Sequence, residues 1–257
     1  MTGTQRPAIK GKARGFTLVE MAMVLMIVAL LLGGLLPTIS SQVEQRHEND
    51  TRKQLDEIQQ ALIGYAIIYG RLPCPASGAT GTGGQEDPNT GIGVCNHPHD
   101  NKSYVPAVTL GLSGADSNGL IEDAWGNPIR YAVANGSSNT FPFTKPNGIS
   151  GIGIANIGSS SIANLDVCST ATGSTSSACG SNYTLTNNAV AVIYSTGKNG
   201  ANGTGAGPDE QENPTGNSTD SDTVYVSHTP SPNFDDMVTW LSPNLLVNRM
   251  VSAGKLP

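Results

Sequence analysis

The chain opens on a short polar segment and then enters an unbroken apolar run. Residues 16–36 read FTLVEMAMVLMIVALLLGGLL, and Glu20 is the single charged side chain among them. A helix rises about 1.5 Å per residue, so this run spans about 30 Å, which is enough to cross the hydrocarbon core of a bilayer. The pattern therefore predicts one membrane-spanning helix over 16–36.

Beyond Pro37 the pattern predicts an amphipathic helix. Its apolar side chains recur at spacings of three and four residues and form one stripe, which consists of Leu55, Ile58, Leu62, Tyr65 and Tyr69. Such a stripe is expected to dock on a sheet. Gly70 and Pro73 are expected to stop the helix. Pro37 is expected to kink or locally melt it, because proline removes a helical hydrogen bond and clashes with the preceding turn.

From residue 73 onward the helical periodicity disappears, and the composition shifts to Gly, Ser, Thr, Asn and Pro. Short β-like runs occur at 129–134, 189–195 and 223–227, with turn-rich stretches at 148–158 and 199–221. We expect an α+β fold, in which the long N-terminal helix packs on a small antiparallel sheet with long surface loops.

The C-terminal stretch predicts a short helix that folds back onto the body. Asp235 and Asp236 suit a helix start, and Pro243 interrupts or restarts the helix. Helical phase would place the large apolar side chains of this stretch on one face; these are Met237, Trp240 and Leu241.

Charge is distributed unevenly along the chain. The first fifteen residues contain no acid and carry +4 from Arg6, Lys10, Lys12 and Arg14, so the net charge of −6 for the whole chain leaves −10 for the remainder. Basic residues before an apolar helix keep that end in the cytoplasm and place the body across the membrane. An acidic body also argues against nonspecific binding to nucleic acid, which depends on Lys and Arg.

Four cysteines lie in the part of the chain that is expected outside the cytoplasm: Cys74, Cys95, Cys168 and Cys179. An oxidising compartment favours disulfides there. Their order suggests two local pairs, but four cysteines allow three connectivities, and the sequence leaves all three open. A zinc site is disfavoured, because there is no CxxC motif and no histidine pair at ligand spacing near the second two cysteines.

A family resemblance rests on the junction between the basic leader and the apolar run, which reads Gly15-Phe16-Thr17-Leu18-Val19-Glu20. It closely resembles the type IV prepilin signature that pilins and type II secretion pseudopilins share. The resemblance implies cleavage between Gly15 and Phe16 by a prepilin peptidase, followed by N-methylation of Phe16. It also implies that Glu20 engages the N-terminal amine of a neighbouring subunit during assembly. A carboxylate in an apolar segment is usually partnered and functional, although a helix N-terminus alone also favours an acid.

The resemblance implies four segments: a leader peptide at 1–15, a transmembrane and assembly helix at 16–36, an amphipathic stem at 37–72 and a β-rich periplasmic domain at 73–257. The implied function is that of a structural subunit of a type IV pilus or a type II secretion pseudopilus-like filament. The expected partners are the prepilin peptidase, an inner-membrane assembly platform and other pilin-like subunits. Before assembly the chain is expected to span the inner membrane once, with a cytoplasmic N-terminus and a periplasmic body.

Two stretches of the body resemble turns of the major pseudopilin. Residues 123–128 read DAWGNP and resemble its D-x-W-G-N-P turn, while residues 193–200 read IYSTGKNG and resemble its S-x-G-x-D/N-G turn. In major pseudopilins the loop after the second motif binds calcium. Here that region supplies hard oxygen ligands, namely Asp209, Glu210, Glu212, Asp220 and Asp222.

The loop is longer than in the major pseudopilin and has no EF-hand spacing, so a solvated acidic loop is the favoured interpretation. The alternative is a calcium site formed by Asp209, Glu210, Asp220 and Asp222. No other cofactor is expected.

No catalytic motif is evident in the sequence, because GxSxG, HExxH and a phosphate-binding glycine loop are all absent. His97 and His99 are expected in a surface loop. We therefore expect a minor or specialised structural subunit and not an enzyme. Two alternatives stay open. One is a major pilin, and the other is an adhesin or ligand-binding module whose face is formed by the loops at 78–104 and 199–221.

Overall fold

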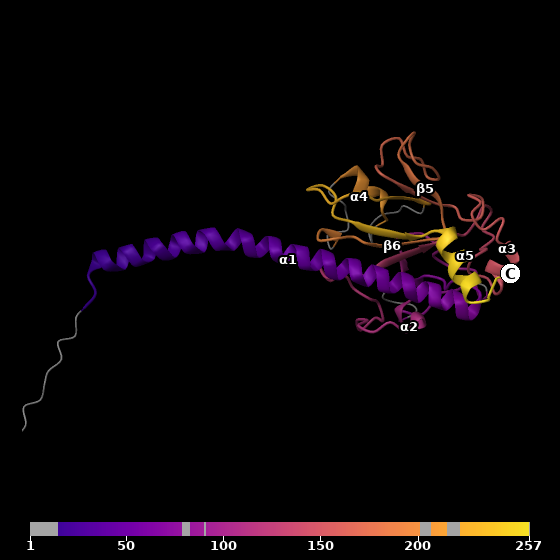
Figure 1. Cartoon of the computed structure of the whole chain (residues 1–257), viewed down its shortest axis with the longest axis horizontal. Helices are drawn as coiled ribbons and strands as arrows, with labels where there is room; N and C mark the ends of the chain where they lie inside the picture. Colours follow the sequence, from indigo (N-terminus) through magenta and orange to yellow (C-terminus); the bar gives the residue numbers. More distant parts are fainter. Residues whose placement is uncertain (1–14, 79–82, 90, 201–206, 215–221, 257) are drawn as a thin grey trace, which may run out of the picture. The chain divides into compact units, whose positions relative to one another are not determined.

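The computed structural model describes residues 15–78, 83–89, 91–200, 207–214 and 222–256, and it does not describe the side chains of residues 33–40. The chain divides into two units, one ending at Arg46 and the other running from His47 to Pro257. The secondary structure is α+β, and Figure 1 labels its helices and the strands β5 and β6.

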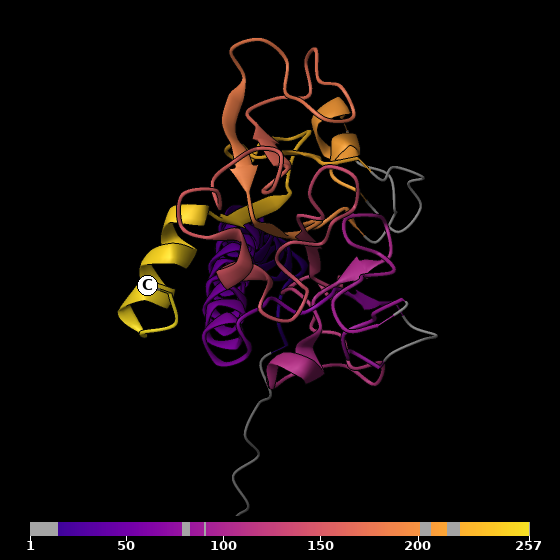
Figure 2. The ribbon, with the colours of Figure 1, turned by 90° about the vertical axis from the view of Figure 1, so that its right-hand side faces the viewer.

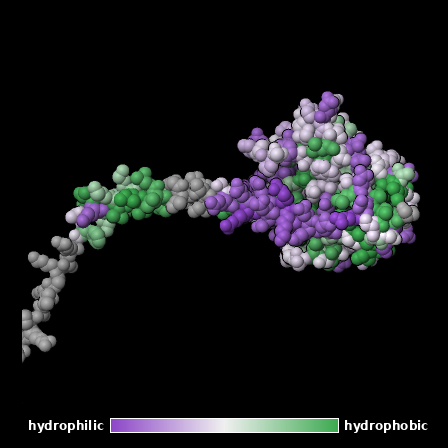
Figure 3. Space-filling model, in the orientation of Figure 1, coloured by the Kyte–Doolittle hydropathy of each residue, from purple (hydrophilic) through white to green (hydrophobic). Residues whose placement is uncertain are grey.

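Helix α1 (Leu18–Tyr69) provides the structured part of the first unit and continues into the second. It extends continuously through Pro37, where the sequence predicted a kink or local melting. Between Phe16 and Leu32 the large apolar side chains are exposed, from 43% for Val28 to 89% for Leu18, and Figure 3 shows this stretch as largely hydrophobic surface. Among the residues with described side chains, no helix is both long and apolar enough to cross a membrane.

From His47 onward α1 belongs to the second unit, and its apolar stripe is buried as predicted, with one exception. The members that join the main core are Leu55, Ile58 and Leu62, together with the adjacent Ile63 and Ala66. Tyr65 is also buried, whereas Tyr69 is 57% exposed. The helix ends as predicted at Gly70, which has a φ of 66° and donates its N–H to the carbonyl of Ala66. Glycine suits this left-handed position because it has no Cβ.

The main sheet has five antiparallel strands in the order β1-β2-β3-β6-β8. Its strands are β1 (Ala76–Ser77), β2 (Ser103–Tyr104), β3 (Arg130–Val133), β6 (Ala191–Ser195) and β8 (Met237–Leu241). Every residue of β3 and β6 is buried, which explains why both runs are almost continuously apolar in the sequence. The predictions of strands at 129–134 and 189–195 are therefore confirmed.

A second sheet was not predicted. It has the order β5-β4-β7 and consists of β4 (Leu165–Cys168), β5 (Thr184–Ala189) and β7 (Val224–Val226). Strands β4 and β7 are parallel, so the body is not built on one antiparallel sheet. The pattern at 223–227 correctly predicted β7. Strand β5 reads TLTNNA and is mostly exposed, so neither its composition nor an alternating pattern marked it as a strand.

The prediction of a helix beginning at Asp235 and Asp236 was wrong. Residues Met237–Leu241 form strand β8, which pairs with β6 over five residue pairs. The helix starts later, as α5 (Pro243–Ser252), where the hydroxyl of Ser242 accepts a hydrogen bond from the Leu245 N–H. Pro243 at the first helical position suits a helix start. The short C-terminal helix is thus present, and it lies close to the end of α1 (Figure 2).

Three short helices lie in the connections. These are α2 (Ala107–Leu110), α3 (Gly148–Ile152) and α4 (Pro208–Glu212). Helices α3 and α4 fall inside the stretches 148–158 and 199–221, which were expected to be turn-rich. Residues of the second stretch that lie outside the described part include 201–206 and 215–221.

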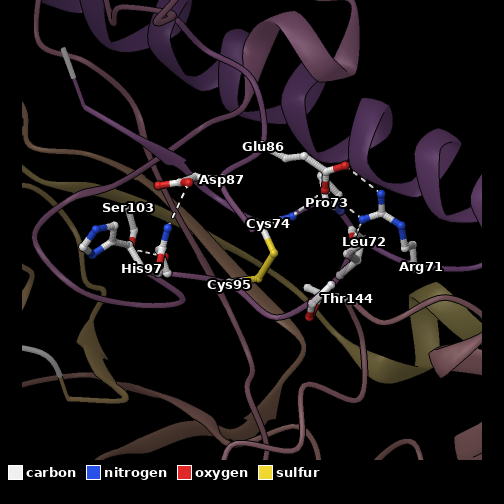
Figure 4. Close-up of a disulfide and its surroundings, with 12 residues drawn as sticks. Arg71, Leu72, Pro73, Cys74, Glu86, Asp87, Cys95, His97, Ser103 and Thr144 are labelled. Carbon is white, nitrogen blue, oxygen red and sulfur yellow. Dashed lines mark hydrogen bonds and ion pairs between the residues drawn. A yellow bond between two sulfur atoms is a disulfide. The ribbon is translucent and has the colours of Figure 1, made fainter. Parts of the chain in front are cut away.

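Two disulfides join neighbouring cysteines, Cys74 with Cys95 and Cys168 with Cys179. These are the two local pairs that the order of the cysteines suggested. Beside the first disulfide, the Arg71 guanidinium makes two hydrogen bonds to the Glu86 carboxylate, of 2.6 and 2.8 Å (Figure 4). Glu86 also accepts the backbone N–H of Cys74. This ion pair therefore joins the end of α1 to the disulfide-bonded loop.

Removal of this partly buried ion pair tests its contribution to the fold. Burial opposes ionisation of Glu86, but the hydrogen bonds and charge of Arg71 outweigh it and lower the pKa of Glu86. Glu86→Gln leaves the guanidinium without its counter-charge and should reduce the free energy of unfolding by about 2–3 kcal/mol. Urea denaturation of the full chain in detergent measures this loss.

Glu57→Gln is the matched control, because Glu57 pairs with Lys53 at the surface and both side chains are more than 60% exposed. It should change the free energy of unfolding by less than about 0.5 kcal/mol. Equal losses in the two variants would contradict a special role for the pair beside the disulfide.

Candidate functional site

The first candidate site is the junction at Gly15 and Phe16 together with the first turn of α1. The hydroxyl and backbone N–H of Thr17 both donate to Glu20 Oε2, each at 2.9 Å. The N–H of Glu20 donates in return to the Thr17 hydroxyl at 3.2 Å. This reciprocal pattern is a capping box, which satisfies backbone N–H groups that a helix start leaves unpaired. Glu20 therefore starts the helix, in agreement with the structural alternative considered for it.

The capping box uses only one of the two carboxylate oxygens of Glu20. Both bonds from Thr17 end on Oε2, and no described residue donates a hydrogen bond to Oε1. Phe16 is 79% exposed, and a Cβ placed on Gly15 would meet no atom within 4 Å. Within the described residues, nothing in the packing of the chain requires glycine at position 15.

In the body, the two turn motifs are joined by hydrogen bonds across about seventy residues of sequence. Asp123 Oδ2 accepts the Ser195 hydroxyl at 2.5 Å, and Asn127 donates its side-chain N–H to the Gly197 carbonyl at 2.6 Å. Asp123 Oδ1 accepts the backbone N–H groups of Trp125 and Asn127. Three of these bonds satisfy the buried carboxylate of Asp123 and the fourth joins the two turns, so this part of both motifs has a structural role.

The second motif also borders an acidic cluster formed by Glu210, Asp235 and Asp236. Carboxylate oxygens from the three residues lie within 4.8 Å of one another. Glu210 and Asp236 are 1% and 4% exposed. Asn199 of the motif donates its side-chain N–H to both oxygens of Glu210 and its backbone N–H to Asp235. The carboxylates therefore come from α4 and from the turn before β8, and Asn199 of the second motif contacts both.

The absence of a side chain at Gly197 is necessary for this arrangement. Its φ is 60°, and a Cβ there would lie 2.5 Å from both the carbonyl oxygen and a carboxylate oxygen of Asp235. Because both the backbone conformation and the close approach exclude a larger residue, the glycine of the second motif determines how near Asp235 can come.

The donor set of the acidic cluster fits a hard, oxygen-seeking cation such as calcium. Asp235 Oδ1 is buried and has no hydrogen-bond partner within the described part of the chain. Burial and the neighbouring Glu210 charge raise the pKa of Asp235 to about 6, and burial raises that of Asp236. Among the described residues this is the group of His, Cys, Asp and Glu side chains that meets the geometry for a metal ion.

Comparison with known proteins bears on the N-terminal site. Residues 10–36 match the family of the prokaryotic N-terminal methylation motif. They form the prepilin-type cleavage and methylation segment of type IV pilins and pseudopilins. The match includes the Gly15-Phe16 junction and the apolar run, as the sequence predicted. No curated protein and no solved structure matches the chain.

Of the four calcium candidates named from the sequence, only Glu210 belongs to the acidic cluster. Asp209 turns to other partners, because it accepts the hydroxyl of Thr170 and the N–H of Ala171 and lies 3.2 Å from His228 Nε2. Asp222 accepts the N–H of Val224. Asp220 lies outside the described residues.

The cluster contains Glu210 together with two residues that sequence reasoning missed. Asp235 and Asp236 had been assigned to a helix start, and no local signal links them to Glu210. The expected position of His97 in a loop agrees with its contact to Asp100, at 2.6 Å, three residues away.

The acidic groups predict an unusual dependence of stability on pH. The pKa of Asp235 and that of Asp166, a carboxyl on β4, are both raised to about 6, in each case chiefly by burial. Between the ordinary aspartate pKa of about 4 and about 6, these two carboxyls therefore hold more protons in the folded chain than in the unfolded chain. The free energy of unfolding should thus fall as the pH rises through this window. Urea denaturation in the presence of a chelator, repeated across the window, measures the slope.

Asp235→Asn and Asp166→Asn should each make that slope shallower, because each removes one proton that the folded chain retains. A free energy of unfolding that rises steadily from pH 4 to pH 6 in the chelated protein would contradict the assignment of these two groups.

Proposed function

We propose that this chain is a structural subunit of a type IV pilus or a type II secretion pseudopilus-like filament. In this proposal a prepilin peptidase cuts after Gly15, Phe16 is N-methylated and α1 carries the subunit into the filament. The observation that carries the proposal is the N-terminal methylation motif on a helix whose apolar side chains, from Phe16 to Leu32, are exposed.

Exposed apolar surface of this kind needs a partner other than water. Each large side chain moved from water into an apolar environment gains about 1.5–3 kcal/mol. Before assembly the bilayer provides that environment, and the basic leader keeps the N-terminus cytoplasmic. After assembly, the same helices of other subunits provide it. The two disulfides suit a body located in the oxidising periplasm.

The geometry of Glu20 suits two successive roles. In the uncut chain its Oε2 caps α1, and Oε1 accepts no hydrogen bond from the described residues. Cleavage after Gly15 leaves the Thr17 N–H and hydroxyl in place, so the cap persists in the mature chain. Oε1 then pairs with the new α-amino group of Phe16 on a neighbouring subunit. A charge inside an apolar assembly is tolerated when it is paired in this way.

The implied partners are the peptidase, an assembly platform in the inner membrane and other pilin-like subunits. Proteins with this methylation motif are structural subunits rather than enzymes, and we assign the same class to this chain. The satisfied Asp123–Ser195 junction supports a rigid body behind the helix. No described feature of the body requires chemistry on a substrate.

The proposal is tested by determining the first residue of the mature protein. Protein purified from the membranes of its own host should begin at N-methylated Phe16, as determined by intact-mass and peptide mass spectrometry. A chain that still begins at Met1 in cells with an active prepilin peptidase would reduce α1 to an ordinary anchor and refute the proposal.

Glu20→Ala separates processing from assembly in the same experiment. The variant should still be cut after Gly15, while its recovery in sheared filaments should fall about ten-fold or more, because the pairing of Oε1 is lost. Thr17→Val is the matched control, since it removes the hydroxyl of the cap and keeps the carboxylate. Normal filament incorporation of the Glu20 variant would refute the assembly role.

We also propose that calcium binds this subunit at Glu210, Asp235 and Asp236. Three clustered carboxylates, two of them buried, repel one another unless a cation offsets their charge. A bound calcium ion would supply that charge and fix the loop that carries α4 against β8. The unpartnered Oδ1 of Asp235 supports this set of ligands.

Thermal unfolding of the full chain tests the calcium proposal. Calcium at about 100 times its dissociation constant should raise the free energy of unfolding by about 2.7 kcal/mol. Asp236→Asn should abolish the increment, whereas Asp209→Asn should retain it, because Asp209 lies outside the cluster. Equal responses to calcium in both variants, or none in the unaltered chain, would refute the site.

A further inference from the structure

A polar cavity on the outer face of the second sheet contains a carboxylate that the fold does not use. Asp166 lies on β4, between Leu165 and Val167, which both point into the main core. Its side chain therefore faces the opposite side of the sheet. It is only 7% exposed and lines a cavity of about 420 Å³.

The carboxylate of Asp166 has no hydrogen-bond or ion-pair partner among the described residues. Burial alone raises its pKa, with no donor or cation to oppose it. An unpaired, largely buried carboxylate destabilises a fold, so its presence here calls for another use. The contrast with Asp123 is informative, since that carboxylate is equally buried and accepts three hydrogen bonds.

The cavity is surrounded by hydroxyl groups from five separate positions. These are Ser137, Ser160, Ser177, Thr184 and Thr223. The side-chain amide of Asn187 joins them. Hydroxyls and amides both donate and accept hydrogen bonds. The volume lies within the range of about 300–1,000 Å³ that is usual for small-molecule sites.

The second disulfide holds one wall of the cavity. Cys168 is on the same face of β4 as Asp166, two residues further along, and is bonded to Cys179, which lines the cavity next to Ala178 and Ser177. The loop between the two cysteines is therefore tied over the floor formed by Asp166. Such a covalent constraint keeps the site formed in the absence of a ligand.

We propose that this cavity binds a saccharide residue, with Asp166 accepting hydrogen bonds from two of its hydroxyls. Saccharide hydroxyls donate to the carboxylate and exchange hydrogen bonds with the surrounding Ser, Thr and Asn groups. Among the described lining residues none is basic, so an anion would meet an uncompensated carboxylate. An ammonium group would pair with Asp166 and leave the hydroxyl donors unused.

The residues that line this site do not belong to the loops at 78–104 and 199–221, where the sequence suggested a ligand-binding face. It goes beyond the structural role proposed above and does not depend on cleavage after Gly15. A chain that fails to be processed can therefore still bind, and a processed chain can fail to bind, so the two proposals fail separately.

The test is ligand-observed saturation-transfer NMR on the full chain in a zwitterionic, sugar-free detergent. The probes are the methyl glycosides of glucose, galactose, mannose and N-acetylglucosamine, with methylammonium as the cationic competitor. At least one glycoside should receive saturation, and methylammonium should not. Asp166→Asn should weaken binding about ten-fold or more, because a charge-assisted hydrogen-bond acceptor is lost.

Two further variants complete the test. Thr184→Val removes one rim hydroxyl at nearly constant volume and should weaken binding several-fold. Glu57→Gln removes an exposed carboxylate outside the cavity and should leave binding unchanged. The melting temperature of Asp166→Asn should equal or exceed that of the unaltered chain, since the variant removes an unpaired buried charge.

Three results would overturn the proposal. The first is the absence of saturation transfer to every glycoside. The second is glycoside binding that is unchanged in a folded Asp166→Asn variant. The third is binding of methylammonium in an Asp166-dependent manner while no glycoside binds.

Discussion

The packing of one face of α1 against the buried strands of the main sheet is the interaction on which the rest of the body depends. Leu55, Ile58 and Leu62 share a core with β3, β6 and β8, and Gln59 donates its side-chain N–H to the Trp240 carbonyl of β8. Burial of this apolar stripe supplies the main stabilisation. Because β3 and β6 are paired beneath the helix, the turn before β3 and the turn after β6 are brought together.

The contact between the turn before β3 and the turn after β6 positions polar side chains of the body. Asp123 is fully satisfied there by a hydroxyl and two backbone N–H groups. Burial raises the pKa of Asp123, and in the acidic cluster burial and like charges together raise the pKa values of Asp235 and Asp236. Carboxylates with enough donors stabilise the fold, whereas those without them are candidates for binding a ligand. This distinction separates the structural motif from the two proposed sites.

The N-terminal segment obeys a different constraint. Its apolar side chains have no cover within the described residues, and its one charge is held in a capping box. A helix that begins with its own cap can form before any assembly takes place. The other oxygen of this carboxylate, Oε1, accepts no hydrogen bond from the described residues, and we propose that it pairs with a neighbouring subunit. In this proposal, Glu20 both caps the start of the helix and pairs with a neighbouring subunit.

The sequence by itself was sufficient to predict the elements whose formation depends only on residues close together in the chain. The prepilin-type junction, the helix stop at Gly70 and the runs that became β3, β6 and β7 could all be predicted, because helix and strand periodicity is a property of adjacent positions. The preference for two local cysteine pairs agrees with the two disulfides for a similar reason, since each pair closes a short loop.

Only the tertiary structure decided the features that depend on distant partners. Residues 237–241 form a strand because β6 presents an open edge with which they pair, although their spacing also suits a helix. Glu210 meets Asp235 and Asp236 because α4 lies beside the turn before β8. Asp166 faces a cavity because the second disulfide ties a loop across it. Hydrogen bonding between strands and the burial of charge are set by residues far apart in the chain, so no local pattern records them.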